Sequence, residues 1–498
     1  MPLSRKRSRS NSRRRFLGLF DIGGRQVAGE LTLKGAGTLL KLHDTDTIAH
    51  VEQGVCVYGS AYSGEHITLI NCRSPGPGLA GFPDGRKIYH TEVFPYYVVL
   101  GRGYIQPSEP CIRAIHFTST DLMTLFYDFD AFSTVIDARP IIDAVLQERR
   151  QLRSVESGER PLVCYFTGRE RIVEVQTAIG RVSVYHSPSY NLGGPGGVYI
   201  RNRIGISIEP ETPVAFDQAL ERMHDLASFL SMTAGRRQGL NHIHMVTTYG
   251  TDESPLYVEA HPSYRTKDPK DLEQYKPHPA DVPLDPIRHA EEFRAVLTDW
   301  LHRHERWRAA RVRYLDCLRK DDVYDADRLI AAANTFDILP ADAVPGATAL
   351  STDLAATKNA CEILFRLHPR GIDRNSALSA LGRLGQPSLP KKVLHRVAIV
   401  DAVFESRFPD LAFVASTAVK CRNFLVHGSD EIGVAKIEHL FPFVTDALEF
   451  IFAASDFIDA GWDARRWNSL GHSWGHSFAR FRGEYNVRLA QLRQAIKA

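Results

Sequence analysis

The sequence is poor in cysteine and has no long apolar run. Its 498 residues include seven cysteines, an odd number, and no two of them are spaced as a CxxC pair. This usage predicts buried free thiols in a reducing compartment and argues against a disulfide framework. No signal peptide precedes the fold, and no apolar stretch approaches the roughly 18 residues of a membrane-spanning helix. We therefore expect a soluble cytoplasmic protein.

Acidic residues are missing from the first fifteen positions, which contain seven basic ones. The rest of the chain carries 54 basic and 58 acidic side chains, so the net charge of +3 comes from this segment. Because serines are interleaved with the basic residues, we expect residues 1–16 to form a disordered basic tail that can add nonspecific affinity for phosphate. The alternative is a tail that is merely solvated.

The N-terminal half shows the pattern of antiparallel strands. From residue 28 to about 210, short runs rich in Val, Ile, Tyr and Thr alternate with Gly and Pro turns. Strands are expected over 30–33, 38–42, 54–58, 66–71, 93–100, 113–117, 171–176, 203–208 and 240–248, with a helix over 213–232. This pattern predicts a β-rich, sandwich-like domain.

A proline-rich stretch from 255 to 286 follows, and the sequence beyond it is helical. Helices are expected over 287–320, 323–338, 351–367, 374–385, 390–404, 411–427 and 437–460, which predicts an antiparallel bundle. We therefore predict an α+β protein. Its parts would be a β-rich domain over 17–280, an all-α bundle over 286–464, and a basic helix or arm over 465–498.

One hexapeptide in the helical half contains two candidate catalytic side chains. Arg422 and His427 stand five positions apart at the end of the helix expected over 411–427. Arginine is always cationic and can hold a phosphate or a phosphorane by two hydrogen bonds. Histidine titrates near neutrality and can move the proton of a ribose 2′-hydroxyl. RNA cleavage without a metal ion needs these two groups, although they could also simply cap and solvate a core helix.

The expected helix has an apolar stripe and an opposite polar stripe, both with spacings of three and four. The apolar stripe is Leu411, Val414, Ala418, Cys421 and Leu425, and the polar stripe is Ser416, Lys420, Asn423 and His427. At about 100° per residue, Arg422 and His427 lie roughly 140° apart around the axis, so we do not expect them to meet within one regular helix. Either the last turn loosens at Gly428 or two chains share the site. We favour a symmetric dimer.

The hexapeptide resembles the Arg-polar-x-x-x-His signature of the HEPN family, all-helical domains of RNases, and the wider chain resembles the ApeA-like anti-phage HEPN proteins. The similarity extends to Gly428 and Ser429, to the upstream helical segment 329–339, and to the N-terminal segments 29–33 and 67–72. It covers most of residues 17–460. Toxin-type HEPN proteins that pair with a nucleotidyltransferase carry a Tyr two residues after the His. Because this position is Ser429, we do not expect that route of regulation.

The resemblance implies a metal-independent endoribonuclease that cuts host RNA, such as tRNA, in abortive-infection defence. His427 would deprotonate the 2′-hydroxyl or protonate the 5′-oxygen leaving group, and Arg422 would stabilise the phosphorane, leaving a 2′,3′-cyclic phosphate. Asn423 would orient the imidazole or the phosphate, and Lys420 would bind RNA. No metal or cofactor is expected. The N-terminal domain would sense a phage-derived trigger or restrain the RNase, in a homodimer or a higher even oligomer.

Two other functional classes remain open. The helical bundle could bind RNA or dimerise without catalysis, or the N-terminal domain could be the main functional part, as a sensor of a ligand or phage protein.

Other motifs in the sequence give weaker indications of a functional site. His472 and His476 have a metal-compatible spacing but no third ligand, and His242 and His244 are expected on a solvated strand face. The glycine-rich loop 193–197 lacks the Lys-Ser/Thr of a phosphate-binding loop.

Overall fold

The computed structural model divides into two compact units. The sheet unit comprises residues up to 227 together with 238–273, and the helical unit comprises 228–237 and 274–498. The structure describes residues 14–44, 49–81, 87–191, 193–251, 254–264, 276–347, 349–429, 432–471 and 473–497. The first thirteen residues, and with them most of the predicted basic tail, lie outside the described residues.

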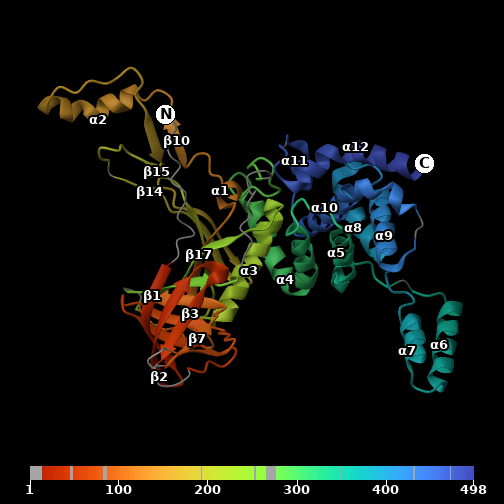
Figure 1. Cartoon of the computed structure of the whole chain (residues 1–498). Coiled ribbons are helices and arrows are strands. Elements are labelled where there is room, and N and C mark those ends of the chain that lie inside the picture. The colour runs from red at the N-terminus through yellow and green to blue at the C-terminus, as the bar shows by residue number, and fades with distance from the viewer. Residues whose placement is uncertain are drawn as a thin grey trace. The chain divides into compact units, whose positions relative to one another are not determined.

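Within the described residues, fourteen strands of the sheet unit form one antiparallel sheet (Figure 1). Across the sheet their order is β12, β13, β16, β9, β17, β18, β8, β5, β4, β1, β2, β3, β7, β6. Their bounds are β1 (Arg14–Ile22), β2 (Arg25–Leu33), β3 (Leu39–Asp44), β4 (Val57–Ala61), β5 (His66–Ile70), β6 (Pro77–Gly81), β7 (Lys87–Val93), β8 (Tyr97–Gly101), β9 (Ile112–Ser119), β12 (Arg171–Thr177), β13 (Gly180–His186), β16 (Ile204–Glu209), β17 (Leu240–Thr247) and β18 (Leu256–Pro262). Two short ladders lie apart from it, β10 (Phe132–Val135) with β11 (Val163–Phe166) and β14 (Ser189–Tyr190) with β15 (Ile200–Arg201).

One end of this sheet curls around a single apolar core. Val93 of β7 and Leu100 of β8 both lie in that core, although five strands separate β7 from β8 in the hydrogen-bonded order. Phe20 of β1 is fully buried there. A Cβ atom at Gly59 of β4 or at Gly29 of β2 would come within 2.3 or 2.9 Å of its ring. Glycine is needed on both neighbouring strands because the aromatic ring approaches their backbones closely.

The other end of the sheet packs on helix α3 (Phe216–Ala234). The rings of Phe216 and Tyr97 of β8 meet edge to face at 5.5 Å, and Arg222 donates a hydrogen bond of 2.6 Å to the carbonyl of Ile179. The strands supply buried Val, Ile and Met side chains at alternate positions, as expected for a sheet with one covered face. The last turns of α3, from Ser228 on, belong to the helical unit.

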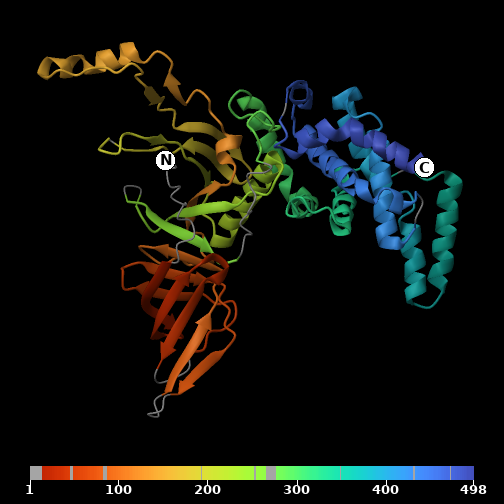
Figure 2. The same ribbon diagram turned by 45° about the horizontal axis from the view of Figure 1, so that its top comes forward.

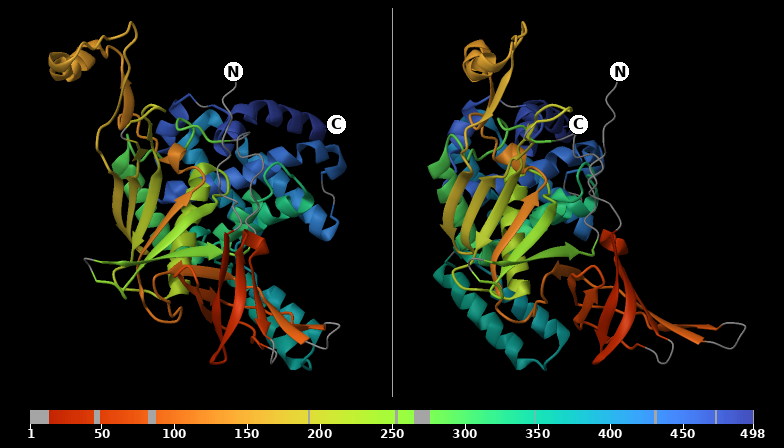
Figure 3. Two further views of the ribbon diagram at one scale, coloured as in Figure 1. Left: turned by 60° about the vertical axis from the view of Figure 1, so that its left-hand side comes forward. Right: turned by 90° about the vertical axis from the view of Figure 1, so that its left-hand side faces the viewer.

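An arm extends from the sheet unit between β10 and β11, and it carries helix α2 (Arg139–Leu152) (Figure 3). No residue of α2 is buried, and its apolar residues Ile141, Val145 and Leu152 are exposed. A short helix, α1 (Leu122–Leu125), precedes the arm.

The helical unit is a bundle around helix α10. Its helices are α4 (Ala290–Leu318), α5 (Ala326–Asp337), α6 (Thr352–Leu367), α7 (Ile372–Gly382), α8 (Leu389–Phe404), α9 (Leu411–His427), α10 (Phe441–Asp459), α11 (Ala464–Ser469) and α12 (Ser477–Lys497). Helix α10 packs against α4, α5, α8, α9 and α12, and nearly every residue from Phe443 to Phe457 is buried. A mostly apolar helix with nearly every residue buried is stable in the middle of a bundle, where its few charged side chains also find partners.

Helices α6 and α7 form a hairpin that extends from the bundle (Figure 2). The two helices pack on each other, and neither contains a buried residue. Ile363, Leu367 and Ile372 are strongly exposed on the hairpin.

The predicted α+β class and the order of β-rich and helical regions are confirmed. The predicted sandwich differs in one respect, because its strands form a single hydrogen-bonded sheet that curls rather than two separate sheets. The strand predicted over 93–100 is two strands, since β7 ends at Val93 and the chain turns at Pro95 before β8. Proline cannot donate to a sheet ladder, so a strand ends there.

The predicted ends of the chain also need correction. Residues 14–16, assigned to the disordered tail, lie in β1, where Phe16 is buried and Arg15 pairs with Glu30 at 3.3 Å. The C-terminal segment is helical as predicted, but it is not a free arm. Helix α12 buries Phe481 and Tyr485 against the bundle, where the ring of Phe481 lies 4.8 Å from that of Phe450 on α10.

Candidate active site

Helix α9 presents the hexapeptide at its C-terminal end. It starts after Asp410 and ends at His427. The next residue, Gly428, has a left-handed conformation (φ 75°), and its backbone nitrogen donates to the carbonyl oxygen of Phe424 at 2.7 Å. Glycine adopts this conformation without strain, so the helix stops directly after the histidine. Four residues of the apolar stripe of α9 are buried in the bundle, and the fifth, Leu425, is half-buried. Arg422 is left half-buried and His427 exposed.

Arg422 and His427 meet within one chain. Nη1 of Arg422 lies 3.4 Å from Nε2 of His427. The expectation that one regular helix keeps the two groups apart is therefore wrong. The backbone positions do diverge around the axis, but the arginine side chain is long and flexible enough to reach the next turn. A second chain is not needed to bring this pair together, so the spacing of the two residues no longer argues for a site shared between two chains.

A hydrogen bond across this contact requires one tautomer of the imidazole. Because arginine can only donate, Nε2 of His427 must accept, and the proton of the neutral ring is then on Nδ1. An imidazole in this state can take a proton from a hydroxyl group at Nε2. For that to happen, Nη1 of Arg422 must turn to another acceptor.

Two asparagines hold the guanidinium of Arg422. Asn334 of α5 accepts hydrogen bonds from Nε at 3.2 Å and from Nη2 at 3.0 Å through the same Oδ1 atom. Asn423, the next residue of α9, accepts from Nη1 at 3.2 Å. The expectation for Asn423 was a contact with the imidazole or the phosphate. Its observed bond orients the arginine, and a contact with the phosphate stays a prediction.

Asn334 was not among the site residues predicted from the sequence. It lies in the segment 329–339, whose neighbouring residues Ala333, Thr335 and Phe336 are buried in the bundle. Asparagine is a poor helix former because its amide competes for backbone hydrogen bonds. An asparagine next to the apolar run Leu329–Ala333 was the available signal, since an amide in such a place must find a partner.

Lys420 is exposed on α9. It precedes His427 by seven residues, or about two turns, and so lies on the same side of the helix. Its predicted role in binding RNA stays a prediction.

The other histidine motifs have structural explanations. His476 is fully buried, and its Nε2 lies 3.1 Å from the carbonyl of Thr233 while its Nδ1 accepts from the N–H of Phe478. His472 lies outside the described residues. His242 and His244 are exposed on β17, as predicted.

No three His, Cys, Asp or Glu side chains of the described ranges gather in a way that could hold a metal ion. No helix in the same ranges is long and apolar enough to cross a membrane.

Two family models match the chain. The first, described as ApeA N-terminal domain 1, covers residues 15–300, and the second, described as Apea-like HEPN, covers residues 330–466. The first alone spans more than half of the sequence. The chain belongs to the ApeA-like HEPN family. No curated protein and no solved structure shows significant similarity to it.

The HEPN match contains Asn334, Arg422, Asn423 and His427, so all four members of the cluster lie in the segment that resembles the family. HEPN domains are generally nucleases of RNA. The cluster is thus placed in the part of the chain where family membership leads us to look for an active site.

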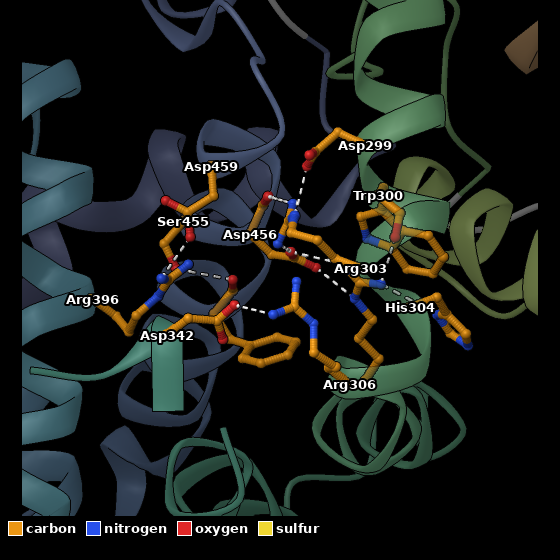
Figure 4. Close-up of polar contacts among 12 residues, drawn as sticks. Asp299, Trp300, Arg303, His304, Arg306, Asp342, Arg396, Ser455, Asp456 and Asp459 are labelled. Carbon is orange, nitrogen blue, oxygen red and sulfur yellow. Dashed lines mark hydrogen bonds and ion pairs between the residues drawn. The ribbon is translucent and has the colours of Figure 1, made fainter. Parts of the chain in front are cut away.

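Helix α4 precedes the HEPN match but is joined to α10 by buried ion pairs (Figure 4). Asp456 of α10 accepts from Nε and Nη2 of Arg311, both at 2.9 Å, and from Nη1 of Arg303 at 2.9 Å. Burial alone would raise the pKa of Asp456, but the arginines, Arg311 first, hold it below its usual value. On α8, Arg396 bonds to Ser455 at 2.9 Å. These contacts fix α4 and α8 on α10 because an unpaired buried charge is costly.

A second ion pair fixes α5, the helix that carries Asn334. Arg328 in its first turn donates to both carboxylate oxygens of Glu449 on α10, at 2.7 and 2.9 Å. Beside it, Asp446 accepts from the hydroxyl of Tyr324 at 2.8 Å. Burial, together with the charge of Glu449, raises the pKa of Asp446 to about 7. Asn334 follows Arg328 by less than two turns, so this anchor sets the position from which it reaches Arg422.

Proposed function

We propose that the chain is a HEPN endoribonuclease that cleaves host RNA, such as tRNA, in abortive-infection defence against phage. The observation that carries the proposal is the contact between Arg422 and His427, 3.4 Å apart at an exposed helix end. It joins a permanent cation to a proton acceptor, and both lie within the HEPN match. These are the groups that intramolecular cleavage of an RNA phosphodiester requires.

The chemistry follows from the two side chains. Nε2 of His427 takes the proton of a ribose 2′-hydroxyl, and the resulting alkoxide attacks the adjacent phosphorus. Negative charge builds up on the phosphorane oxygens, and Nη1 of Arg422 turns from the imidazole to donate to them. The bond to the 5′-oxygen breaks, and the imidazolium returns a proton to this leaving group. The products are a 2′,3′-cyclic phosphate and a 5′-hydroxyl.

Other parts of the chain receive supporting roles in this proposal. Asn423 orients the guanidinium, and Lys420 neutralises a neighbouring phosphate of the RNA. The sheet unit senses a phage-derived trigger or restrains the nuclease, and the active form is a homodimer or a higher even oligomer.

The test is cleavage of total RNA by the purified protein in EDTA, with sequencing of 2′,3′-cyclic phosphate ends. We expect such ends with the wild type and none with His427→Ala. The matched control is His302→Ala, which removes an exposed histidine from α4 and should leave cleavage unchanged. Cleavage that persists in His427→Ala would refute the assignment. RNA binding without any new ends would instead favour a non-catalytic RNA-binding module.

A further inference from the structure

The contact between Asn334 and Arg422 differs from the contacts that hold the buried arginines of the helical unit. Its single amide oxygen accepts from two nitrogens of the guanidinium, Nε at 3.2 Å and Nη2 at 3.0 Å. This fixes one edge of the planar group. The Nη1 corner is turned to the exposed histidine.

The fully buried arginines of the helical unit are held differently. Each of three is paired with a carboxylate, namely Arg311 with Asp456, Arg328 with Glu449 and Arg396 with Asp459. The contacts of Arg422 within the described residues are with two amide oxygens and an imidazole nitrogen, all of them uncharged when the imidazole is neutral. Among the described residues, the partners that hold Arg422 in place thus include no carboxylate.

This difference matters for binding an anion. A carboxylate at position 334 would hold the guanidinium at least as firmly, because charge-assisted hydrogen bonds are stronger than neutral ones. It would also cancel most of the positive charge that attracts a phosphate group. An amide oxygen orients the same edge and leaves the charge of the arginine available.

We propose that Asn334 is a positioning residue that fixes Arg422 for an RNA phosphate while keeping its charge uncompensated. This inference rests on the proposed function for the catalytic consequences, but the binding of phosphate that it predicts does not require catalysis. A merely structural role would be different, since Asn334 would then serve only to link α5 to α9.

Asn334→Asp separates the two roles, because it keeps the shape and the acceptor oxygen of the amide and changes only its charge. If the role is structural, the new ion pair leaves both folding and RNA cleavage intact. If Asn334 keeps the charge of Arg422 available, the variant folds normally but cleaves RNA on the order of 10- to 100-fold more slowly in kcat/KM. Its acidic limb of the pH–rate profile should also move to higher pH by roughly half a unit, because a carboxylate near His427 favours the imidazolium.

Binding provides a readout that is independent of cleavage. The probe is an oligonucleotide of mixed sequence in which every ribose is 2′-O-methylated, so that no 2′-hydroxyl can attack. We expect Asn334→Asp to weaken its binding and to make the slope of log K against log salt shallower by about 0.7, the value for one lost phosphate contact on a single strand. Asn486→Asp on the exposed side of α12 makes the same change in net charge and should leave both quantities unchanged.

The outcomes distinguish this inference from the proposed function. A wild-type protein that binds the probe but cuts no RNA, with binding still weakened in Asn334→Asp, would refute the nuclease and support the inference. Wild-type binding and salt dependence in Asn334→Asp would overturn the inference, whether or not the wild-type protein cleaves RNA. Thermal unfolding of the variant at or above the wild-type temperature shows that any loss is not a loss of fold.

Discussion

Nη1 of Arg422 lies 3.4 Å from Nε2 of His427, although five residues separate the two on one helix. The arginine is oriented from the side of α5 and the histidine stands at the end of α9, so the pair is supported by two helices that ion pairs and apolar packing fix on α10. Because the guanidinium bonds to Asn334 along one edge and reaches His427 with Nη1, the site depends on the planar shape of this group as well as on its charge.

Arg422→Lys should impair cleavage far more than binding. Lysine keeps the positive charge, but its ammonium group is a point charge that cannot bond along one edge to Asn334 and still reach His427. We expect single-turnover cleavage of RNA to fall on the order of 10²- to 10³-fold, as for loss of one donor to a developing oxyanion. Affinity for a 2′-O-methylated RNA should change much less. Near-wild-type cleavage by Arg422→Lys would mean that charge alone is sufficient at this position.

Mixing two inactive variants tests whether one chain supplies the whole site. Arg422→Ala and His427→Ala each lack one member of the pair. Because both side chains meet within one chain, we expect equal mixtures, refolded together to exchange subunits, to remain as inactive as either variant alone. Activity that appears only in the mixture would show that two chains share the site, as the helical wheel of α9 first suggested.

The helical wheel misled because it locates backbone positions and not the ends of long side chains. Roughly 140° between two residues is decisive for short side chains, but an arginine spans a turn of helix along the surface. Most helices and strands were predictable because their sequence patterns do depend on backbone positions. Periods of two and of 3.6 depend on backbone geometry, so β2, β9 and the helices from α4 to α10 follow directly from the spacing of apolar residues.

Asn334 was not predictable as a member of the site because its partner lies 88 residues further along the chain. Sequence spacing carries no information on which face of α5 meets α9, since this depends on how both helices pack on α10.

Strand β1 was also missed, because a charge partner of its first residue is distant in the sequence. Its arginines read as part of a basic tail, whereas in the fold Arg14 pairs with Glu259 of β18 at 3.2 Å.

Removing the carboxylate of Asp456 should destabilise the helical unit strongly. Asp456→Ala leaves Arg311, which is 1% exposed and hydrogen-bonded to both carboxylate oxygens, as an uncompensated buried charge. We expect the free energy of unfolding of this unit to fall by about 3 to 5 kcal/mol in urea denaturation. Asp342→Ala is the matched control, because its partner Arg306 is 58% exposed and such surface pairs contribute about 0 to 1 kcal/mol. Similar losses in the two variants would contradict the role given to the buried network.

Asp446 should make the stability of the helical unit fall as pH rises. Burial, together with the nearby Glu449, raises its pKa from 3.8 to about 7, so between these values the folded protein binds a proton that the unfolded chain has released. This proton stabilises the fold most fully below about pH 4, and the contribution is lost as pH rises through 7. Asp446→Asn is neutral at every pH and its amide oxygen can still accept from the hydroxyl of Tyr324. We expect the variant to match the wild type near pH 4 and to exceed it at pH 8 by on the order of 1 to 3 kcal/mol in urea denaturation. A difference between the two proteins that does not change with pH would show that the carboxyl group of Asp446 ionises in the folded state as it does in the unfolded chain.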